Sequence, residues 1–205
     1  MTQIFKINEL KEALSLYKKS DIISFPTDTV YGIGANIYSQ EAIMKIYNTK
    51  HRPLNKPLAV LCANKEQILE VVEEIPTAID HLIKYFLPGP LTVILPKKTT
   101  IPHYITSNLN TIGVRIPNHP VALEILKEIG PLATTSANFS GDESINNGED
   151  VIKLLGKDID IIIDGGLTTI GIPSTVVAFE NGKIKIYREG VITENDIKKS
   201  LALLD

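Results

Sequence analysis

Short apolar runs alternate with amphipathic segments along the whole chain, and this alternation is the strongest constraint on its fold. The runs typical of buried strands lie at residues 21–25, 58–62, 91–96, 111–117, 131–136 and 159–164. Helical spacing of apolar residues appears at about 8–17, 39–50, 77–86 and 120–129, and further helices are expected after Asn64 and from Thr193. Asn181-Gly182, within residues 174–190, predicts a hairpin with a tight turn. We therefore expect one α/β domain, covering residues 1–205, on a twisted mixed β-sheet flanked by helices.

Composition and charge exclude several classes of protein. A hydrophobic content of 43% with 22% charged residues is ordinary for a globular protein. The net charge of −3 argues against wrapping duplex nucleic acid by bulk electrostatics. No apolar run approaches the roughly 20 residues of a membrane span, and the first residues resemble neither a signal nor a transit peptide. We expect a cytoplasmic protein with no membrane partner.

Familiar catalytic motifs are absent from the sequence. Cys62 is the only cysteine, and its apolar surroundings predict a core residue. The histidines show no metal-binding spacing, so no metal site is expected. Neither a Walker-type phosphate loop nor a G-x-G-x-x-G fingerprint occurs, nor does a G-x-S-x-G elbow. A nucleotide, if bound, must be held by a different kind of binding motif.

Polar residues follow an apolar run in the stretch SFPTDTVYGIG, residues 24–34. We expect the strand to end at Pro26-Thr27-Asp28-Thr29 and the chain to restart as a helix at Ser39. A ligand-binding mouth is one interpretation. The other is an ordinary strand-to-helix turn, in which Thr27 and Asp28 bond their own backbone.

Two further stretches suit phosphate groups. Residues 48–57 carry Lys50, Arg52 and Lys56, with prolines directly behind two of these cations. A rigid frame for such charges favours phosphate binding, although cations at a helix end are often simply solvated. Residues 133–141, ATTSANFSG, crowd hydroxyl and amide side chains after an apolar strand, where backbone N–H groups could cradle phosphate. A plain polar loop is the alternative.

Arg115 lies inside the otherwise apolar run IGVRIP. A buried arginine must have a partner or open into a cavity. We favour a ligand carboxylate or phosphate as that partner over an internal salt bridge. For Arg188, at a predicted strand end, the sequence does not decide between a ligand and a protein group as the partner. Such cations, hydroxyls and amides would work by positioning and charge neutralisation, as in phosphoryl or nucleotidyl transfer.

Seven motifs together resemble the YrdC/Sua5 family, in order and at family-like spacing, over about residues 8–190. They are PTDTVYGIG, KHRPLNKPLAVL, LPGPLTVIL, GVRIPNHP, TTSANFSG, GIPSTVV and YREG. The resemblance implies a YrdC-like domain with a concave ligand-binding face. It also implies a threonylcarbamoyl-AMP synthase, a nucleotidyltransferase. Such an enzyme makes threonylcarbamoyl-adenylate and pyrophosphate from L-threonine, bicarbonate or CO₂, and ATP. That product feeds the t⁶A modification at position 37 of tRNA, through downstream threonylcarbamoyl transferase proteins.

The resemblance also implies roles for individual residues. The family's K-x-R and S-x-N signatures map onto Lys50, Arg52, Ser136 and Asn138, which would line the nucleotide phosphates and form the catalytic set. Positions that hold threonine match Thr29, Arg115, Thr135 and Ser174, with the arginine on the carboxylate. Positions near ATP match Lys56, Thr111 and Arg188. Mg²⁺ is expected to arrive with ATP. The 142–148 loop departs from the family pattern, so no ATP contact is assigned to it.

Other functions remain as alternatives. The related YciO branch would use the same fold on a different substrate. A non-catalytic module binding tRNA or double-stranded RNA through Lys50, Arg52 and Lys56 is another alternative, and weak tRNA binding could accompany catalysis. The negative net charge and the lack of tryptophan count against this module. Relative to the longer Sua5 form, we expect no second C-terminal domain.

Overall fold

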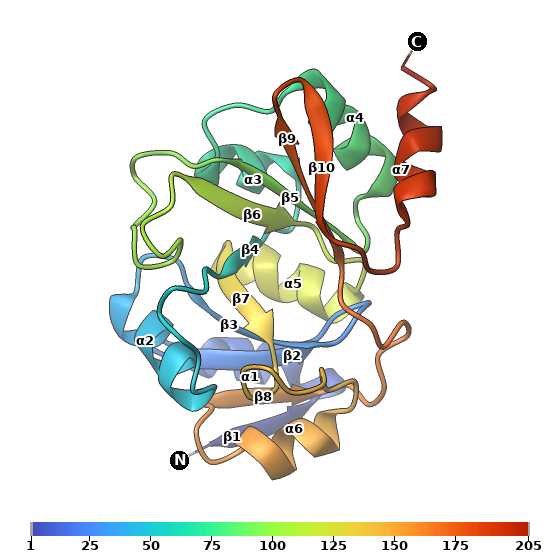
Figure 1. Ribbon diagram of the computed structural model, residues 1–205. Helices are drawn as coiled ribbons and strands as arrows, with labels where there is room; N and C mark the ends of the chain where they lie inside the picture. The colour runs from blue at the N-terminus through green and yellow to red at the C-terminus, as the bar shows by residue number, and fades with distance from the viewer. Residues whose placement is uncertain (1, 205) are drawn as a thin grey trace.

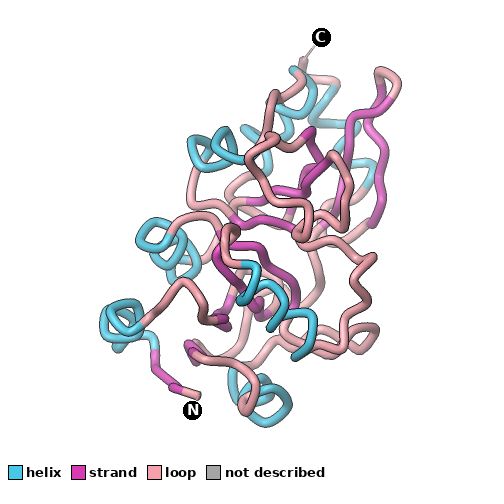
Figure 2. Tube along the Cα trace, turned by 90° about the vertical axis from the view of Figure 1, so that its left-hand side faces the viewer, coloured by secondary structure: helices cyan, strands magenta, loops and turns pink. Residues whose placement is uncertain are grey.

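Ten strands form one mixed sheet, in the order β1-β8-β2-β3-β7-β4-β6-β5-β9-β10 (Figure 1). This computed structural model describes residues 2–204. The strands are β1 (Gln3–Lys6), β2 (Ile22–Pro26), β3 (Tyr31–Asn36), β4 (Ala59–Leu61), β5 (Leu91–Pro96), β6 (Thr111–Arg115), β7 (Leu132–Ser136), β8 (Ile161–Asp164), β9 (Thr175–Glu180) and β10 (Lys183–Arg188). Parallel pairs such as β4–β6 and antiparallel pairs such as β3–β7 both occur. The two termini lie at opposite ends of the sheet (Figures 1 and 2).

Helices flank both faces of the sheet. They are the 3₁₀ turn η1 (Ile7–Glu9) and α1 (Leu10–Leu16), α2 (Gln40–Thr49), α3 (Lys65–Val71), α4 (Thr77–Phe86), α5 (Pro120–Ile129), α6 (Gly148–Leu155) and α7 (Glu194–Leu201). Buried residues of α1 and α5 pack with one face of β2 and β8. Those of α2, α3, α4, α6 and α7 belong to a larger cluster with β3 to β6. Alternate residues of one strand therefore enter different clusters, as the pleat requires.

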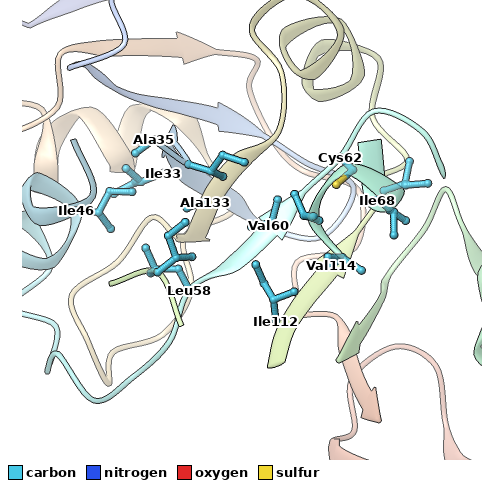
Figure 3. Close-up of a cluster of buried hydrophobic side chains, with 14 of the residues drawn as sticks. Ile33, Ala35, Ile46, Leu58, Val60, Cys62, Ile68, Ile112, Val114 and Ala133 are labelled. Atoms are coloured by element: carbon cyan, nitrogen blue, oxygen red, sulfur yellow. The ribbon is translucent and has the colours of Figure 1, made fainter. Parts of the chain in front are cut away.

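The larger core fills one side of the central strands. Figure 3 shows Ile33, Val60, Ile112 and Val114 from three strands within this cluster, with Ile68 of α3 beside Cys62. Cys62 is fully buried, which confirms it as a core residue, and burial raises the pKa of its thiol. Close packing of apolar side chains here leaves the opposite face of β4, β5 and β6 to carry the site.

Most predicted elements are confirmed, with boundaries that move by a few residues. Helix α4 ends at Phe86 before the LPGP segment, and α5 ends at Ile129 before Gly130, whose φ is 86°. Asn181 and Gly182 both have positive φ in the β9–β10 turn, as a type I′ turn requires. Thr193 and Asp196 form the capping box of α7.

The interpretation of residues 24–34 as a strand leading only to a loop and a helix was wrong. Residues 31–36 form β3, which pairs with both β2 and β7. Gly34 is needed for close packing, since an added Cβ would lie 3.0 Å from Leu132 Cδ1. The stretch is thus a hairpin whose turn, residues 27–30, faces the site. Strand β1 and helix α6 were also not predicted.

Candidate functional site

A cavity of about 370 Å³ opens on the face of the central strands opposite the larger core. Pleating directs Thr111, Gly113 and Arg115 of β6 to the cavity, while Val114 packs in the core. Small residues on neighbouring strands leave the space unfilled. Ala59 pairs with Gly113, and added bulk at Gly113 would meet Thr92 Cγ2 at 3.2 Å. The cavity is a consequence of small residues placed in register.

Most of the predicted site residues line this cavity. They are Thr29, Arg52, Thr111, Arg115, Thr135, Ser136, Ser174 and Arg188. Three others, Lys50, Lys56 and Asn138, are not among the lining residues. Segments far apart in sequence therefore meet at one place, which gives the cavity three arginines and a set of hydroxyl groups.

Arg115 is buried and held by protein groups on three sides. Its Nη2 donates to Asp28 Oδ1 at 2.5 Å, its Nη1 to Thr29 Oγ1 at 2.9 Å and its Nε to the Gly89 carbonyl at 2.9 Å. The sequence predicts a ligand carboxylate or phosphate, rather than an internal salt bridge, as the partner of Arg115. The structure contains the internal salt bridge, and the guanidinium also lines the cavity. Since a guanidinium has five N–H donors, two remain for a ligand.

The Asp28 carboxylate does not bond the backbone of its own turn, as one interpretation of the sequence predicts. It bonds distant residues instead. Its Oδ1 accepts from Arg115 and from the Asn118 backbone N–H at 3.1 Å, while Oδ2 is buried without a partner among the described residues. An unpaired buried acceptor costs about 1–3 kcal/mol. Thr27 does bond its own turn, through the Val30 carbonyl at 2.7 Å.

The turn at residues 27–30 is fixed from outside by the segment 168–171. Ile170 N–H donates to the Asp28 carbonyl at 3.1 Å, and Gly171 N–H donates to the Thr29 carbonyl at 2.8 Å. Thr168 Oγ1 also donates to the Thr29 carbonyl. These bonds hold Thr29 and the Asp28 side chain rigidly beside Arg115.

Arg188 and Ser174 form the wall contributed by the β9–β10 hairpin. Arg188 Nε donates to the Ser174 carbonyl at 3.0 Å, and Nη2 approaches Ser174 Oγ at 3.3 Å. Ser174 Oγ also shares a hydrogen bond of 2.8 Å with Thr92 Oγ1. Within residues 2–204, Arg188 makes no ion pair, so its charge is available to an anion in the cavity.

Arg52 is positioned by backbone carbonyls. Its Nε donates to the Lys56 carbonyl at 3.1 Å, and its Nη2 donates to the Pro57 carbonyl at 2.8 Å. Burial lowers the pKa of Arg52, but a guanidinium stays charged at any physiological pH. Lys56 itself is exposed. The Lys56 and Pro57 backbone thus fixes Arg52, while the Lys56 side chain stays outside the cavity.

Lys50 and Asn138 lie behind the loop that presents Ser136. Lys50 is 1% exposed, and its ammonium donates to the carbonyls of Ser136 and Asn138. The Asn138 amide donates to the Phe139 and Asp142 carbonyls at 2.8 Å. His51 between Lys50 and Arg52 has a φ of 49°, and Arg52 lines the cavity whereas Lys50 does not. Contact of Lys50 or Asn138 with a nucleotide stays a prediction.

The burial of Lys50 predicts a pH-dependent stability. Burial, with Arg52 adding to it, lowers the pKa of Lys50 to about 7 from its model-compound value of 10.5. Folding then releases a proton between these values, so the contribution of Lys50 to stability rises with pH there. From about pH 7 to about pH 9, the free energy of unfolding should rise by about 2 kcal/mol more than in Lys50→Met. Urea unfolding of both proteins tests this. A pH-independent difference would contradict the lowered pKa.

Several residues that line the cavity are not among the individually predicted site residues. Thr27, Thr92, Thr134 and Ser144 contribute hydroxyls or methyl groups to the lining. Thr92 and Thr134 are ordinary strand residues, and only the sheet register reveals which face they occupy. Ser144 lies in the 142–148 loop, to which no contact had been assigned.

Gly190 supports the wall that carries Ser174. An added Cβ would lie 2.3 Å from the Pro173 carbonyl oxygen and 2.8 Å from the Thr175 nitrogen. Backbone atoms cannot move aside independently, so Gly190→Ala should lower the free energy of unfolding by about 1–3 kcal/mol. Urea unfolding measures the loss. An unfolding curve identical to that of the parent would show that the segment relaxes without cost.

The described residues contain neither a candidate metal-binding cluster nor a helix that could span a membrane. Across residues 2–204, no cluster of three or more histidine, cysteine or acidic side chains is arranged to hold a metal ion. None of the helices described in that range has the length and apolar character that crossing a bilayer demands.

Known proteins with the same fold and related sequences place the chain in a family. The Sua5/YciO/YrdC family model, described as "Telomere recombination", matches residues 15–190. Threonylcarbamoyl-AMP synthase of Pyrococcus abyssi is 36% identical over 97% of this chain. The putative threonylcarbamoyl-AMP synthase of Methanocaldococcus jannaschii is 40% identical, with 93% of this chain and 92% of that protein covered. The chain spans 61% of the P. abyssi protein and 56% of the Bacillus subtilis threonylcarbamoyl-AMP synthase.

Solved structures agree with this assignment. The crystal structure of P. abyssi Sua5 complexed with L-threonine superposes with a TM-score of 0.92 at 35% identity, over 97% of this chain and 61% of that one. Escherichia coli YciO superposes with a TM-score of 0.84 at 27% identity, over 93% and 97%. The mixed sheet is thus a known architecture, and the chain belongs to the Sua5/YciO/YrdC family.

Proposed function

We propose that this protein is a threonylcarbamoyl-AMP synthase, which makes threonylcarbamoyl-adenylate and pyrophosphate from L-threonine, bicarbonate or CO₂, and ATP. The observation that carries the proposal is one cavity holding Arg115, Arg52 and Arg188 beside several hydroxyl groups. A relative of high structural similarity has been solved with L-threonine bound. The product would serve t⁶A formation at position 37 of tRNA in the cytoplasm, through downstream threonylcarbamoyl transferase proteins.

Threonine is assigned to the end of the cavity formed by Arg115. The two N–H donors that Arg115 does not use within the protein suit the substrate carboxylate. Thr29, Thr135 and Ser174 supply hydroxyls for the substrate amine and hydroxyl. A substrate that lacks the hydroxyl leaves such groups unpaired, so valine should be rejected more strongly than serine.

ATP is assigned to the part of the cavity lined by Arg52, Thr111, Ser136 and Arg188. The unprotonated amine attacks CO₂ and loses a proton to give a carbamate, and the same carbamate forms from bicarbonate with loss of water. A carbamate oxygen then attacks the α-phosphorus of ATP, and pyrophosphate leaves with the electron pair of the broken P–O bond. Arginines without acidic partners can neutralise the charge that develops, which is the usual means of phosphoryl and nucleotidyl catalysis.

Pyrophosphate release tests the proposed function. We expect release only when ATP, L-threonine and bicarbonate are all present, with formation of threonylcarbamoyl-adenylate by mass spectrometry. Omission of threonine should abolish both signals. Threonine-independent turnover, or none with all three substrates, would instead favour a YciO-like activity on another substrate.

A bound metal is expected only with the nucleotide. The cavity lining contains no aspartate or glutamate, and Asp28 is committed to Arg115. Mg²⁺ prefers oxygen ligands and keeps several waters, so phosphate oxygens would hold it here. Calorimetry with Mg²⁺ alone should show no saturable binding, whereas Mg²⁺ should strengthen ATP binding. Tight binding of Mg²⁺ without nucleotide would contradict this assignment.

Direct binding of tRNA is a weaker second candidate. Lys56 is exposed, and Arg52 is partly exposed at the cavity mouth, where they could contact phosphates. Such binding would weaken steeply with salt and would not respond to ATP or threonine.

A further inference from the structure

The cations of the cavity differ in how their charge is balanced. Arg115 is paired with Asp28 at 2.5 Å, and both side chains are buried. Arg52 and Arg188 bond only carbonyl or hydroxyl oxygens, and neither forms an ion pair in the described part of the chain. A carbonyl fixes a guanidinium without cancelling its charge. The cavity therefore has one neutral arginine site and two cationic ones.

This difference matches the two kinds of ligand that the proposed function requires. Free threonine is a zwitterion with no net charge, whereas a nucleotide triphosphate carries several negative charges. An unbalanced guanidinium attracts a multiply charged phosphate more strongly than a single carboxylate. A guanidinium already paired with a carboxylate keeps its donors but loses that preference.

We propose that Asp28 is a specificity-determining residue that keeps phosphate groups away from Arg115. The inference rests on the proposed function for the identity of the two ligands. Asp28 does not line the cavity, so it acts through Arg115 rather than by touching substrate. Its position is fixed by the Asn118 N–H and by the bonds from segment 168–171 to its turn. Among residues 2–204, Oδ2 has no hydrogen-bond partner, and the one ion pair of this carboxylate is with Arg115.

Other charges near Arg115 do not remove the need for Asp28. Arg188 lies close enough to lower the pKa of Arg115, after the larger effect of burial, and so adds positive potential. His119 lies near Asp28, and burial lowers the pKa of its imidazole, which disfavours a positive charge there. Asp28 is the one acidic side chain that pairs with Arg115 among residues 2–204.

Phosphate binding to the unaltered protein gives the first test. Inorganic phosphate, titrated by calorimetry, should compete with a non-hydrolysable ATP analogue and should not displace L-threonine. Displacement of threonine by phosphate in the parent protein would overturn the proposal. This measurement needs no variant and therefore does not depend on the folding of one.

Asp28→Asn gives the second test, because asparagine keeps the shape and the Oδ1 acceptor but removes the charge. The variant should gain a phosphate site that competes with threonine, and the ratio of the phosphate to the threonine dissociation constant should fall at least ~tenfold. A ratio within twofold of the parent would overturn the proposal. Asp164→Asn is the matched control. Asp164 is a buried carboxylate that pairs with Lys6 at 2.5 Å, and it does not line this cavity. This variant should leave the ratio unchanged.

The two proposals fail in different ways. If the parent binds no threonine, the proposed function fails, while the phosphate titration of Asp28→Asn still decides whether the charge of Asp28 excludes phosphate. If the parent binds threonine and releases pyrophosphate but Asp28→Asn gains no phosphate site, only the role of Asp28 is wrong.

Discussion

Arg115→Ala is expected to lower the free energy of unfolding by about 3–5 kcal/mol. Arg115 and Asp28 are 6% and 4% exposed, so the variant leaves a carboxylate buried without its counter-charge. It also removes the donors to Thr29 Oγ1 and the Gly89 carbonyl. Urea unfolding at neutral pH measures the loss, and threonine binding should disappear while ATP binding persists under conditions where the variant is folded.

A second substitution separates the effect of the unpaired Asp28 carboxylate from the effect of the hydrogen bonds lost with Arg115. Asp28→Asn combined with Arg115→Ala leaves no unbalanced charge, so the double variant should recover at least about 1 kcal/mol relative to Arg115→Ala. Arg188→Ala is the matched control, because Arg188 pairs with no described acidic group, and it should cost only about 1 kcal/mol. A double variant no more stable than Arg115→Ala would show that the ion pair does not carry the effect.

The fold could be predicted in large part because its strands are short, strongly apolar and bounded by clear turn residues. β5 at 91–96 and the β9–β10 hairpin are examples of such strong signals. β3 was missed because Gly32 and Gly34 have low strand propensity and suggest a loop. Here the tertiary context overrides propensity, since a Cβ added at either glycine would lie only 3.0 Å from a side-chain atom of β7.

β1 and α6 were missed for other reasons. β1 has only four residues, and a single one of them is buried, so no alternation could be recognised. α6 begins at Gly148 after a polar loop, and Asn147 caps it through the Glu149 N–H, a signal that the run of asparagines obscured. Both elements depend on contacts with β8 that sequence periodicity does not contain.

The candidate site could be predicted as a set of residues but not as an arrangement. Motif positions identified Arg52, Ser174 and Arg188, all of which line the cavity. Nothing in the sequence shows that Lys50 bonds the Ser136 and Asn138 carbonyls instead of lining the cavity. The partner of Arg115 could not be deduced either, since Asp28 lies 87 residues away along the chain.

Arg52→Ala is expected to lower kcat/KM for ATP by about 100- to 1,000-fold, equivalent to about 3–4 kcal/mol of transition-state stabilisation. The reason is that Arg52 lines the cavity, carries no acidic partner within residues 2–204, and is held in one orientation by the Lys56 and Pro57 carbonyls. A cation fixed in advance stabilises developing phosphate charge without reorganisation. Threonine binding, assigned to Arg115, should change little. Steady-state pyrophosphate release over a range of ATP concentrations gives kcat/KM for the parent and the variant.

Two further variants show whether geometry or charge alone is responsible. Arg52→Lys keeps the charge but cannot bond both carbonyls and a phosphate through a planar fork, so it should restore only part of the activity. Lys127→Ala removes an exposed cation on α5 outside the cavity lining and should keep kcat/KM within about twofold, as expected for a solvated surface charge. If the kcat/KM of Arg52→Lys for ATP equalled that of the parent, a positive charge at this position would be sufficient and the planar guanidinium would not be needed. An Arg52→Ala enzyme with unchanged kcat/KM for ATP would remove Arg52 from the nucleotide site altogether, and the triphosphate would then have to be assigned to Arg188.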